Sequence, residues 1–452
     1  MFKKHTIAIS LAFMLFAQYG EAAPSTLLQV YEKAKVYDAT IKAAKADNQA
    51  NQEEINKSFS AFLPQARLTA YEGRGVTDSE TPGVFGSTSK RHSVYDSKNY
   101  NFSIRQSLFN RANFADYAQS KAEAARSDAT LAKEQLGLMG RVGGAYFDVL
   151  LSAENVQYSE AQKKAAQQQL TQAEKRYKAG IGTVTEINES KANLQTVVAQ
   201  ELEWLNGLEY AKRTLETISG IYLDQFFMLD PVKLTLESPV PNKVEDWVDL
   251  GMKKNPEILA SMHDIEAAQE EISKNSAGHL PTLDLVASRS KTESDNNFTI
   301  GSKYDTDSIG LQLNVPIYNG GYVSATVRQA QAKLDFSQEK LLDKQRIVAN
   351  EIRQYFNEIV NGIARVEAQM EAVKSNEVAV IGTQKGFEAG MRSNVEVLNA
   401  QEKLFSAKRD LAKERYKLLY NRVMLRLTAG VLTESDLGSM SALLTMPSNV
   451  NE

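Results

Sequence analysis

Apolar and polar residues alternate in four segments of the chain, as they do in β-strands with one apolar face. The alternation is clearest over residues 100–109 and 308–317, and it is weaker over 66–72 and over the matching stretch 283–288. The pattern predicts two pairs of strands, one pair in each half of the chain.

The stretches that join the strands of each pair, residues 73–98 and 289–307, are polar and contain glycines, and we expect them to be loops. Strands of about ten alternating residues suit a transmembrane β-strand tilted by ~45°. Four strands cannot close a barrel, since the smallest outer-membrane barrels have about eight, and lipid does not tolerate open sheet edges. We therefore expect the chain to oligomerise, and a trimer would supply twelve strands.

Long helical patterns surround the strand pairs. Residues 110–179 contain no proline and are rich in Ala, Gln, Glu, Lys and Leu. They predict one helix of about 65 residues, about 100 Å long. A second helix of this kind is predicted over 322–389. Shorter helices are predicted over 26–60, over 184–219 and from the second turn to about Thr428.

Four glycines, Gly137, Gly140, Gly143 and Gly144, lie on one stripe of the first long helix. Each costs about 1 kcal/mol relative to Ala in a helix interior. Close packing against another helix is the favoured explanation, and a locally less stable part of the helix is the alternative.

Each long helix ends at a turn, and the two turns have related sequences. In each, a glycine suits the left-handed residue that closes a helix. A Thr or Ser then suits the next N-cap, and a Glu three residues later would complete a capping box. These residues are Gly180, Gly182, Thr183 and Glu186 in the first turn and Gly390, Ser393 and Glu396 in the second. We interpret both turns as tips of helical hairpins.

The second half repeats the order of the first: helix, strand, loop, strand, very long helix, tip and helix. Gln52-Glu53-Glu54-Ile55 recurs as Gln269-Glu270-Glu271-Ile272, and Phe62-Leu63-Pro64 recurs as His279-Leu280-Pro281. We interpret this as two internal structural repeats. The expected divisions are a signal peptide (1–22), a first repeat (23–219), a connecting segment with a short β-like run at 233–237 (220–245), a second repeat (246–429) and a loosely ordered C-terminal tail (430–452).

The N-terminus has the pattern of a secretory signal peptide. Lys3 and Lys4 precede an apolar run, Ile7 to Phe16, that is too short to span a bilayer, and small residues suit cleavage after Ala22. A buried N-terminal helix is the alternative. No later apolar run reaches ~18 residues, so we expect an exported chain that can cross a membrane only with β-strands.

The composition offers little for catalysis. The chain has 452 residues, a formal net charge of −4, no Cys and 4 His that do not cluster in the sequence. These features exclude disulfides and thiolate metal sites, and they do not suggest a nucleic-acid partner. No set of nucleophile, base and orienting residue is visible. Gly180-Ile181-Gly182 follows a helix, unlike a dinucleotide-binding loop. We therefore expect neither an enzyme nor a cofactor or metal site.

Several segments resemble the TolC family of outer-membrane channel-tunnel proteins. They are Gly278 to Leu285, Pro316 to Gly321, Ala145 to Leu150 and the two tips, and the resemblance runs over nearly the whole mature chain. It implies a mainly α fold with a transmembrane β part. Long antiparallel coiled-coil helices of a homotrimer would form an α-helical barrel, continuous with a twelve-stranded β-barrel of four strands per protomer.

The resemblance also implies a place in the cell outer membrane, in contact with its lipid, with the helices extending into the periplasm. The implied function is a passive exit duct for proteins or small toxic compounds, in type I secretion or tripartite efflux. A periplasmic adaptor protein and an inner-membrane pump, ABC-type or proton-driven, would be its partners. A soluble periplasmic coiled-coil structural or interaction protein is the alternative. The cargo, the pump and the adaptor stay open.

In the family the tips form a gate at the periplasmic end. The resemblance implies that Arg392 on the second tip links to Thr185 and Glu186 on the first. Phe387 stands where the family has a Tyr, so one hydroxyl hydrogen bond is missing here.

The family also carries two acidic rings inside the entrance. Glu396 matches the first ring, whereas Asn399 replaces the second. The mouth is therefore expected to attract cations less strongly than in a relative with both rings. A role of Glu186 and Glu396 in helix capping alone is the alternative to the gate and ring roles.

Overall fold

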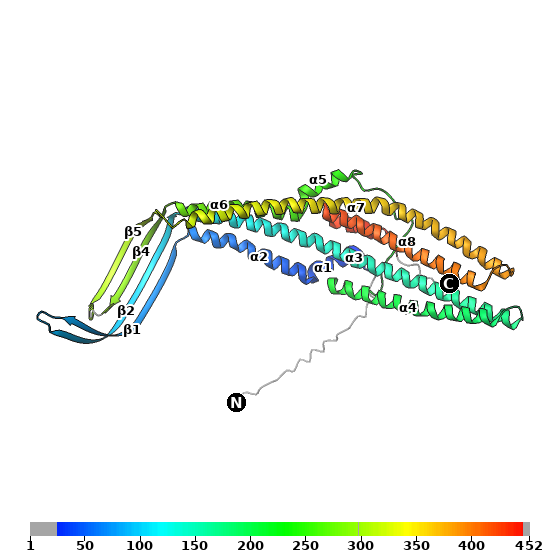
Figure 1. Cartoon of the computed structure of the whole chain (residues 1–452), viewed down its shortest axis with the longest axis horizontal. Helices are drawn as coiled ribbons and strands as arrows, with labels where there is room; N and C mark the ends of the chain where they lie inside the picture. Colours follow the sequence, from blue (N-terminus) through cyan, green and yellow to red (C-terminus); the bar gives the residue numbers. More distant parts are fainter. Residues whose placement is uncertain (1–24, 297, 446–452) are drawn as a thin grey trace, which may run out of the picture.

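The chain forms one elongated body, with a β-sheet at one end and two helical hairpin tips at the other (Figure 1). The computed structural model describes residues 25–296 and 298–445. The expected signal peptide, 1–22, and the last part of the expected tail, 446–452, lie outside these residues. Within the described part of the chain, no helix combines the length and the apolar character that crossing a bilayer requires.

The two halves of the chain present the same elements in the same order. The first half contains α1 (Leu27–Tyr37), α2 (Ala39–Phe59), η1 (Ser60–Phe62), β1 (Gln65–Pro82), β2 (Thr88–Phe109), α3 (Arg111–Lys178) and α4 (Val184–Ser219). The second contains α5 (Val244–Lys254), α6 (Pro256–Ser276), η2 (Ala277–His279), β4 (Thr282–Glu293), β5 (Lys303–Asn314), α7 (Tyr322–Glu388) and α8 (Asn394–Thr428). Three short elements complete the chain: β3 (Met228–Leu229), α9 (Glu434–Ser441) and β6 (Leu444–Thr445). Both long helices lie where the sequence predicts them.

The four long strands form one antiparallel sheet in the order β1-β2-β4-β5. The prediction of loops over 73–98 and 289–307 is wrong. β1 and β2 stay paired out to Pro82 and Thr88, so only residues 83–87 form the turn. β4 and β5 stay paired out to Glu293 and Lys303, and residues 294–302 connect them. Beyond the sheet, β1 and β2 continue as a two-stranded ribbon (Figure 1).

Charged side chains on neighbouring strands support this ribbon. Arg74 lies 3.6 Å from Asp96, and Lys90 pairs with Glu80. Most of its side chains are exposed or half-buried in the single chain, so no apolar face is needed and the sequence shows no alternation of apolar and polar residues. Opposite charges on neighbouring strands stabilise the pairing of β1 with β2. In the sequence these charged residues form a polar stretch that resembles a loop.

One face of the sheet is apolar, because the register brings apolar positions of all four strands together. Leu68 pairs with Phe102, Ile104 with Ala287, Leu285 with Leu311 and Ala287 with Ile309. The other face carries Ser103, Arg105, Asp284, Ser288 and Gln312. Ile309 and Leu311 are exposed in the single chain. The sheet therefore has one apolar and one polar surface.

The predicted N-terminal helix over 26–60 is two helices. Asp38 ends α1 and caps α2, where its carboxylate accepts the Ile41 backbone N–H at 2.8 Å. Asp38 is buried, and Arg141 lies 3.3 Å from it. The helical periodicity continues across this point, so the break rests on the cap and on an ion pair with a distant residue.

The chain after Gly430 is ordered through Thr445, and the expectation of a loose tail is wrong for this part. Its apolar side chains Leu432, Leu437 and Leu444 are buried against α1 and α3. β6 pairs with β3, so the connecting segment has its strand at Met228–Leu229 and not at 233–237 as predicted. A stretch as short as this tail has too few residues to display a periodicity.

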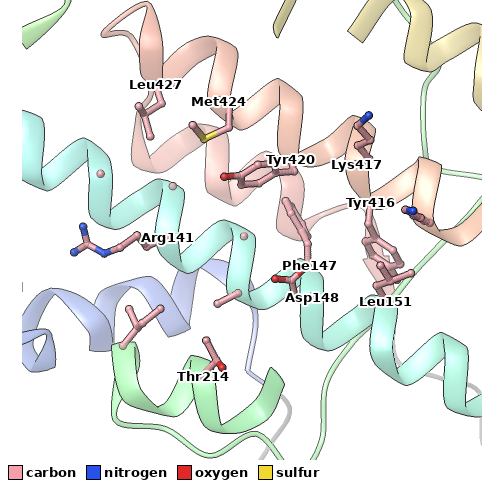
Figure 2. A pocket seen from close by; sticks show the side chains of 16 residues that line it. Arg141, Phe147, Asp148, Leu151, Thr214, Tyr416, Lys417, Tyr420, Met424 and Leu427 are labelled. Carbon is pink, nitrogen blue, oxygen red and sulfur yellow. The ribbon is translucent and has the colours of Figure 1, made fainter. Parts of the chain in front are cut away.

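The glycine stripe lets α3 and α8 approach closely. An added Cβ would lie 2.6 Å from a Leu427 methyl carbon at Gly140 and 3.1 Å from the Tyr420 ring at Gly144. At Gly137 the nearest neighbour is Arg141 of the same helix. Close packing therefore explains the middle of the stripe. A groove of about 730 Å³ runs along this seam, lined by Phe147, Tyr416, Tyr420 and Met424 among others (Figure 2).

Candidate functional site

The two hairpin tips have the same backbone structure. After α3, Gly180 has a φ of +75°, and after α7, Gly390 has a φ of +74°. The carbonyl of Arg176 accepts the N–H groups of Ile181 and Gly182, and the carbonyl of Gly386 accepts the matching pair from the second tip. Glycine at these φ values avoids the strain that a Cβ would cause.

Gly182 is required for a different reason. It has no positive φ, but an added Cβ would lie 2.8 Å from the Tyr177 backbone nitrogen. The added Cβ would also lie 3.0 Å from the Arg176 Cβ, whereas the second tip has Gly386 at the place that matches Arg176. Arg392 occupies the place that matches Gly182 in the second tip.

Only the second tip has a complete capping box. The Ser393 hydroxyl accepts the Glu396 N–H at 3.3 Å, and the Glu396 carboxylate accepts the Ser393 N–H at 2.7 Å. In the first tip the Thr183 hydroxyl accepts the Glu186 N–H at 3.2 Å. The Glu186 carboxylate turns instead toward Arg176, 3.9 Å away.

Arg392, in the turn before α8, pairs with Glu396 in the first turn of α8 at 2.6 Å. Within the described part of one chain it does not reach Thr185, which is exposed, or Glu186. A link from Arg392 to those residues therefore needs a neighbouring chain. The Ser393 N–H, and next the Arg392 guanidinium, lower the pKa of Glu396 below its usual range. Asn399 is exposed on the same helix.

Phe387 is buried, at 2% exposure, between the two hairpins. The Arg176 guanidinium lies 4.6 Å from the centre of its ring. Arg176 thus contacts Phe387 on one hairpin and Glu186 on its own. Arg176 is not predictable from the sequence, because a basic residue in the last turn of a helix is common and has no distinctive signal.

Asn394 is a second tip residue whose contacts the sequence does not predict. It is the first residue of α8 and is 3% exposed, yet its side chain is polar. Its amide donates to Glu189 and to Ser190 of α4, both at 3.2 Å, and accepts from Gln169 of α3 at 2.8 Å. An Asn at the start of a helix is usually interpreted as a local capping residue. The sequence therefore does not predict its hydrogen bonds to distant residues.

Over the described ranges, 25–296 and 298–445, no group of three or more His, Cys, Asp or Glu is placed to hold a metal ion. The charged groups of the tips engage in helix capping and in pairs with one another. What the arrangement can do is hold two hairpins together and present charge at the end of the molecule.

Comparison with known proteins identifies the family. The model of the outer membrane efflux protein family matches residues 30–221 and 247–431. The protease secretion protein PrtF of Dickeya chrysanthemi is 33% identical, over 96% of this chain and 94% of its own length. The alkaline protease secretion protein AprF of Pseudomonas aeruginosa is 32% identical, over 95% and 89%. The outer membrane protein TolC of Escherichia coli is 30% identical, over 98% and 90%.

Solved structures share the fold. The chain resembles CusC with a TM-score of 0.77 at 17% identity, over 90% of this chain and 92% of that one. It resembles the outer membrane protein VceC of Vibrio cholerae with a TM-score of 0.73 at 19% identity, over 89% and 96%. With the family model and the relatives spanning nearly its whole length, the chain belongs to the outer membrane efflux protein family and is an outer-membrane channel-tunnel for export that extends into the periplasm.

Proposed function

We propose that three copies of the chain close into one tunnel, with a twelve-stranded β-barrel in the outer membrane and an α-helical barrel below it. The observation that carries this proposal is the open sheet. In the part of the chain that the structure describes, the edge strands β1 and β5 each pair on one side only. Lipid does not tolerate such edges, and four strands are too few to close. The apolar sheet face suits lipid, and the polar face suits an aqueous lumen.

The helices support the same assembly. Near the tips they pack in the order α4, α3, α8 and α7, so α4 and α7 are the outer helices of each chain. Both carry exposed apolar residues, such as Leu202 and Tyr210 on α4 and Val378 and Ile381 on α7. Contact between α7 of one copy and α4 of the next would bury them and continue the helical wall.

We further propose that the tunnel consists of two structural repeats, 23–219 and 246–429, joined by 220–245. The separate matches of the family model to 30–221 and 247–431 support this division, as does the shared element order. The second repeat would begin slightly earlier than predicted, because α5 starts at Val244.

The tunnel would act as a passive exit duct, with a periplasmic adaptor and an inner-membrane pump supplying selection and energy. Arg392, Thr185, Glu186 and Phe387 would form its periplasmic gate. Two relatives above 30% identity are named for protease secretion, which favours a secreted protein as cargo. Solvent efflux proteins match at 24% over 64% of the chain, so small compounds are the second candidate. Membership in an outer-membrane family argues against a soluble periplasmic protein.

The oligomeric state tests the proposal. Mature protein extracted in mild detergent should have the mass of a trimer by light scattering, and the trimers should form conducting channels in planar bilayers. A monomer with intact β-structure by circular dichroism would overturn the closed-barrel proposal. Cargo is tested by complementation: cells lacking their own channel should regain release of a protein substrate, or resistance to small toxic compounds, when this chain is expressed.

A further inference from the structure

A buried polar cluster joins the two hairpins of one chain near their tips. At its centre is Asn394, from the hairpin of α7 and α8. Gln169 and Ser190, from the hairpin of α3 and α4, are 3% and 0% exposed. Apolar side chains, including Ala173 and Val397, are buried nearby along the same helices. Buried polar groups are costly unless paired, so this cluster is stable only while the two hairpins stay in contact.

The amide of Asn394 uses both its donor and its acceptor atoms across the seam. Its nitrogen donates to the Glu189 carboxylate and to the Ser190 hydroxyl, both at 3.2 Å, and its oxygen accepts from Gln169 at 2.8 Å. Separation of the hairpins would break all of these hydrogen bonds together. Fully satisfied networks of this kind hold one specific arrangement more firmly than isolated pairs do.

Arg392 offers a contrast two residues away. Its side chain is 58% exposed and pairs with Glu396, four residues further along the same hairpin. Exposed ion pairs contribute little and are screened by salt. Near the tips, two other contacts also cross the seam: Gln384 donates to Gln172 at 3.1 Å, and Arg176 lies over Phe387. Of these contacts, the Asn394 cluster is the most buried and has the most hydrogen bonds.

We propose that Asn394 couples the two hairpins of each protomer and thereby holds the mouth of the tunnel closed. The inference rests on the proposed gate at the tips, and it names a residue that the gate of Arg392, Thr185 and Glu186 does not include. Opening requires the seam between the two hairpins to give way at this cluster.

Asn394→Asp is the direct test, measured as single-channel conductance in planar bilayers and as cell permeability to large antibiotics. The new carboxylate has the same size but cannot donate, and it faces Glu189. An acidic residue in the first turn suits the helix itself, so the variant should fold. We expect the open population to rise by about tenfold or more, and tenfold corresponds to about 1.4 kcal/mol.

Asn188→Asp is the matched control. Asn188 is exposed on α4, next to Glu189, and among the described residues its amide donates within its own helix, to the Val184 carbonyl at 3.1 Å. This variant adds the same charge at the same level of the molecule without touching the cluster. Its conductance should stay at the wild-type level.

Glu189→Gln should rescue Asn394→Asp. In the double variant the amide and the carboxylate exchange places. The new amide at position 189 then donates to the new carboxylate at position 394. Gln169 keeps its acceptor, and the Ser190 hydroxyl, which accepts in the wild type, donates to the new carboxylate instead. We expect the double variant to return to wild-type conductance. A residue without direct contact to Glu189 would show no such coupling.

A cross-link tests whether the seam itself opens. The chain has no Cys, so Gln172→Cys with Gln384→Cys provides the only thiol pair. Bridging this pair with a short bifunctional thiol reagent should abolish the extra conductance of Asn394→Asp, and a cleavable reagent should allow it to return on reduction.

Three outcomes would overturn the inference: wild-type conductance in Asn394→Asp, an equal rise in Asn188→Asp, or no rescue by Glu189→Gln. The proposed function fails differently, since then the wild-type chain would form neither trimers nor channels. If channels form and Arg392 variants open them while Asn394→Asp does not, only the role of Asn394 is refuted.

Discussion

At the residue scale, Arg392 has two competing partners. In one chain it pairs with Glu396 at 2.6 Å, and the proposed gate link to Thr185 or Glu186 would have to replace this pair with one to a neighbouring chain. Phe387 cannot donate a hydroxyl hydrogen bond, but the Arg176 guanidinium over its ring supplies a different contact. The two arginines of the tips, Arg392 and Arg176, therefore each have a partner within one chain.

Arg392→Ser should raise single-channel conductance several-fold and make cells more permeable to large antibiotics, because the variant cannot link neighbouring tips. High salt should partly reproduce this effect in the wild type, since exposed pairs are screened. Planar bilayers at low and high salt measure both. If Arg392→Ser and Glu186→Gln each leave conductance unchanged at low salt, the ionic gate is refuted. Apolar packing around Phe387 would then be the remaining explanation for the closed state. Val395 is 43% exposed and adds little to this packing.

Glu396→Gln should reduce cation selectivity in planar bilayers. In a trimer Glu396 would supply three carboxylates, and their removal would take away the partner that Arg392 has within one chain. Gln also fits a capping box, so the helix start is retained and the charge alone is tested. Because the pKa of Glu396 is lowered, its carboxylate stays ionised in mild acid, and wild-type selectivity should decline only below the usual titration range of Glu. Unchanged selectivity would mean that Glu396 acts only as a capping residue.

At the element scale, the ribbon of β1 and β2 is the element that differs most from the structure predicted from the sequence. Its cross-strand charges allow strands to continue well past the sheet, and its turn carries a fully exposed Phe85 and a left-handed Gly86. In the proposed topology this end of the molecule faces outward, and the hairpin tips face the periplasm.

An epitope inserted after Gly86 should be accessible to antibody on intact cells. Gly86 lies in a turn with nothing within 4 Å of an added Cβ, so an insertion there should not disturb the ladder. An epitope inserted after Gly180, at the first tip, serves as the control and should be labelled only after the outer membrane is permeabilised. The opposite result at both sites would reverse the orientation.

At the scale of the whole molecule, stability is concentrated in its middle. The larger apolar clusters join α1, α3, α9 and β3 on one side and α5, α7 and α8 on the other. The cluster between α3 and α4 nearer the tips is smaller. Tips with little apolar core can move while the middle of the tunnel keeps its shape.

A stop codon after Gly430 should sharply reduce the yield of trimers in the outer membrane. It removes Leu432, Leu437 and Leu444 from the larger cluster, and each buried Leu contributes about 1.5–3 kcal/mol. A chain ending at Thr445 keeps these contacts and is the control. Equal trimer yield and equal melting temperature for both truncations would show that α9 does not stabilise the molecule.

The sequence by itself determined the elements whose signal is periodic or local. Residues 100–109 alternate, 110–179 lack proline, and Gly180 and Gly390 stand where a left-handed residue ends a helix. Each of these features acts through backbone preference or through one apolar face, and neighbouring residues are enough to reveal it.

Only the tertiary structure decided the rest, because the partners lie far apart in the chain. Asp38 breaks a helix with help from Arg141, and Arg74 extends a strand by facing Asp96. Asn394 couples two hairpins through Gln169, 225 residues away. A polar residue has the same appearance in a sequence whether it faces water or a buried partner, and only the fold distinguishes the two.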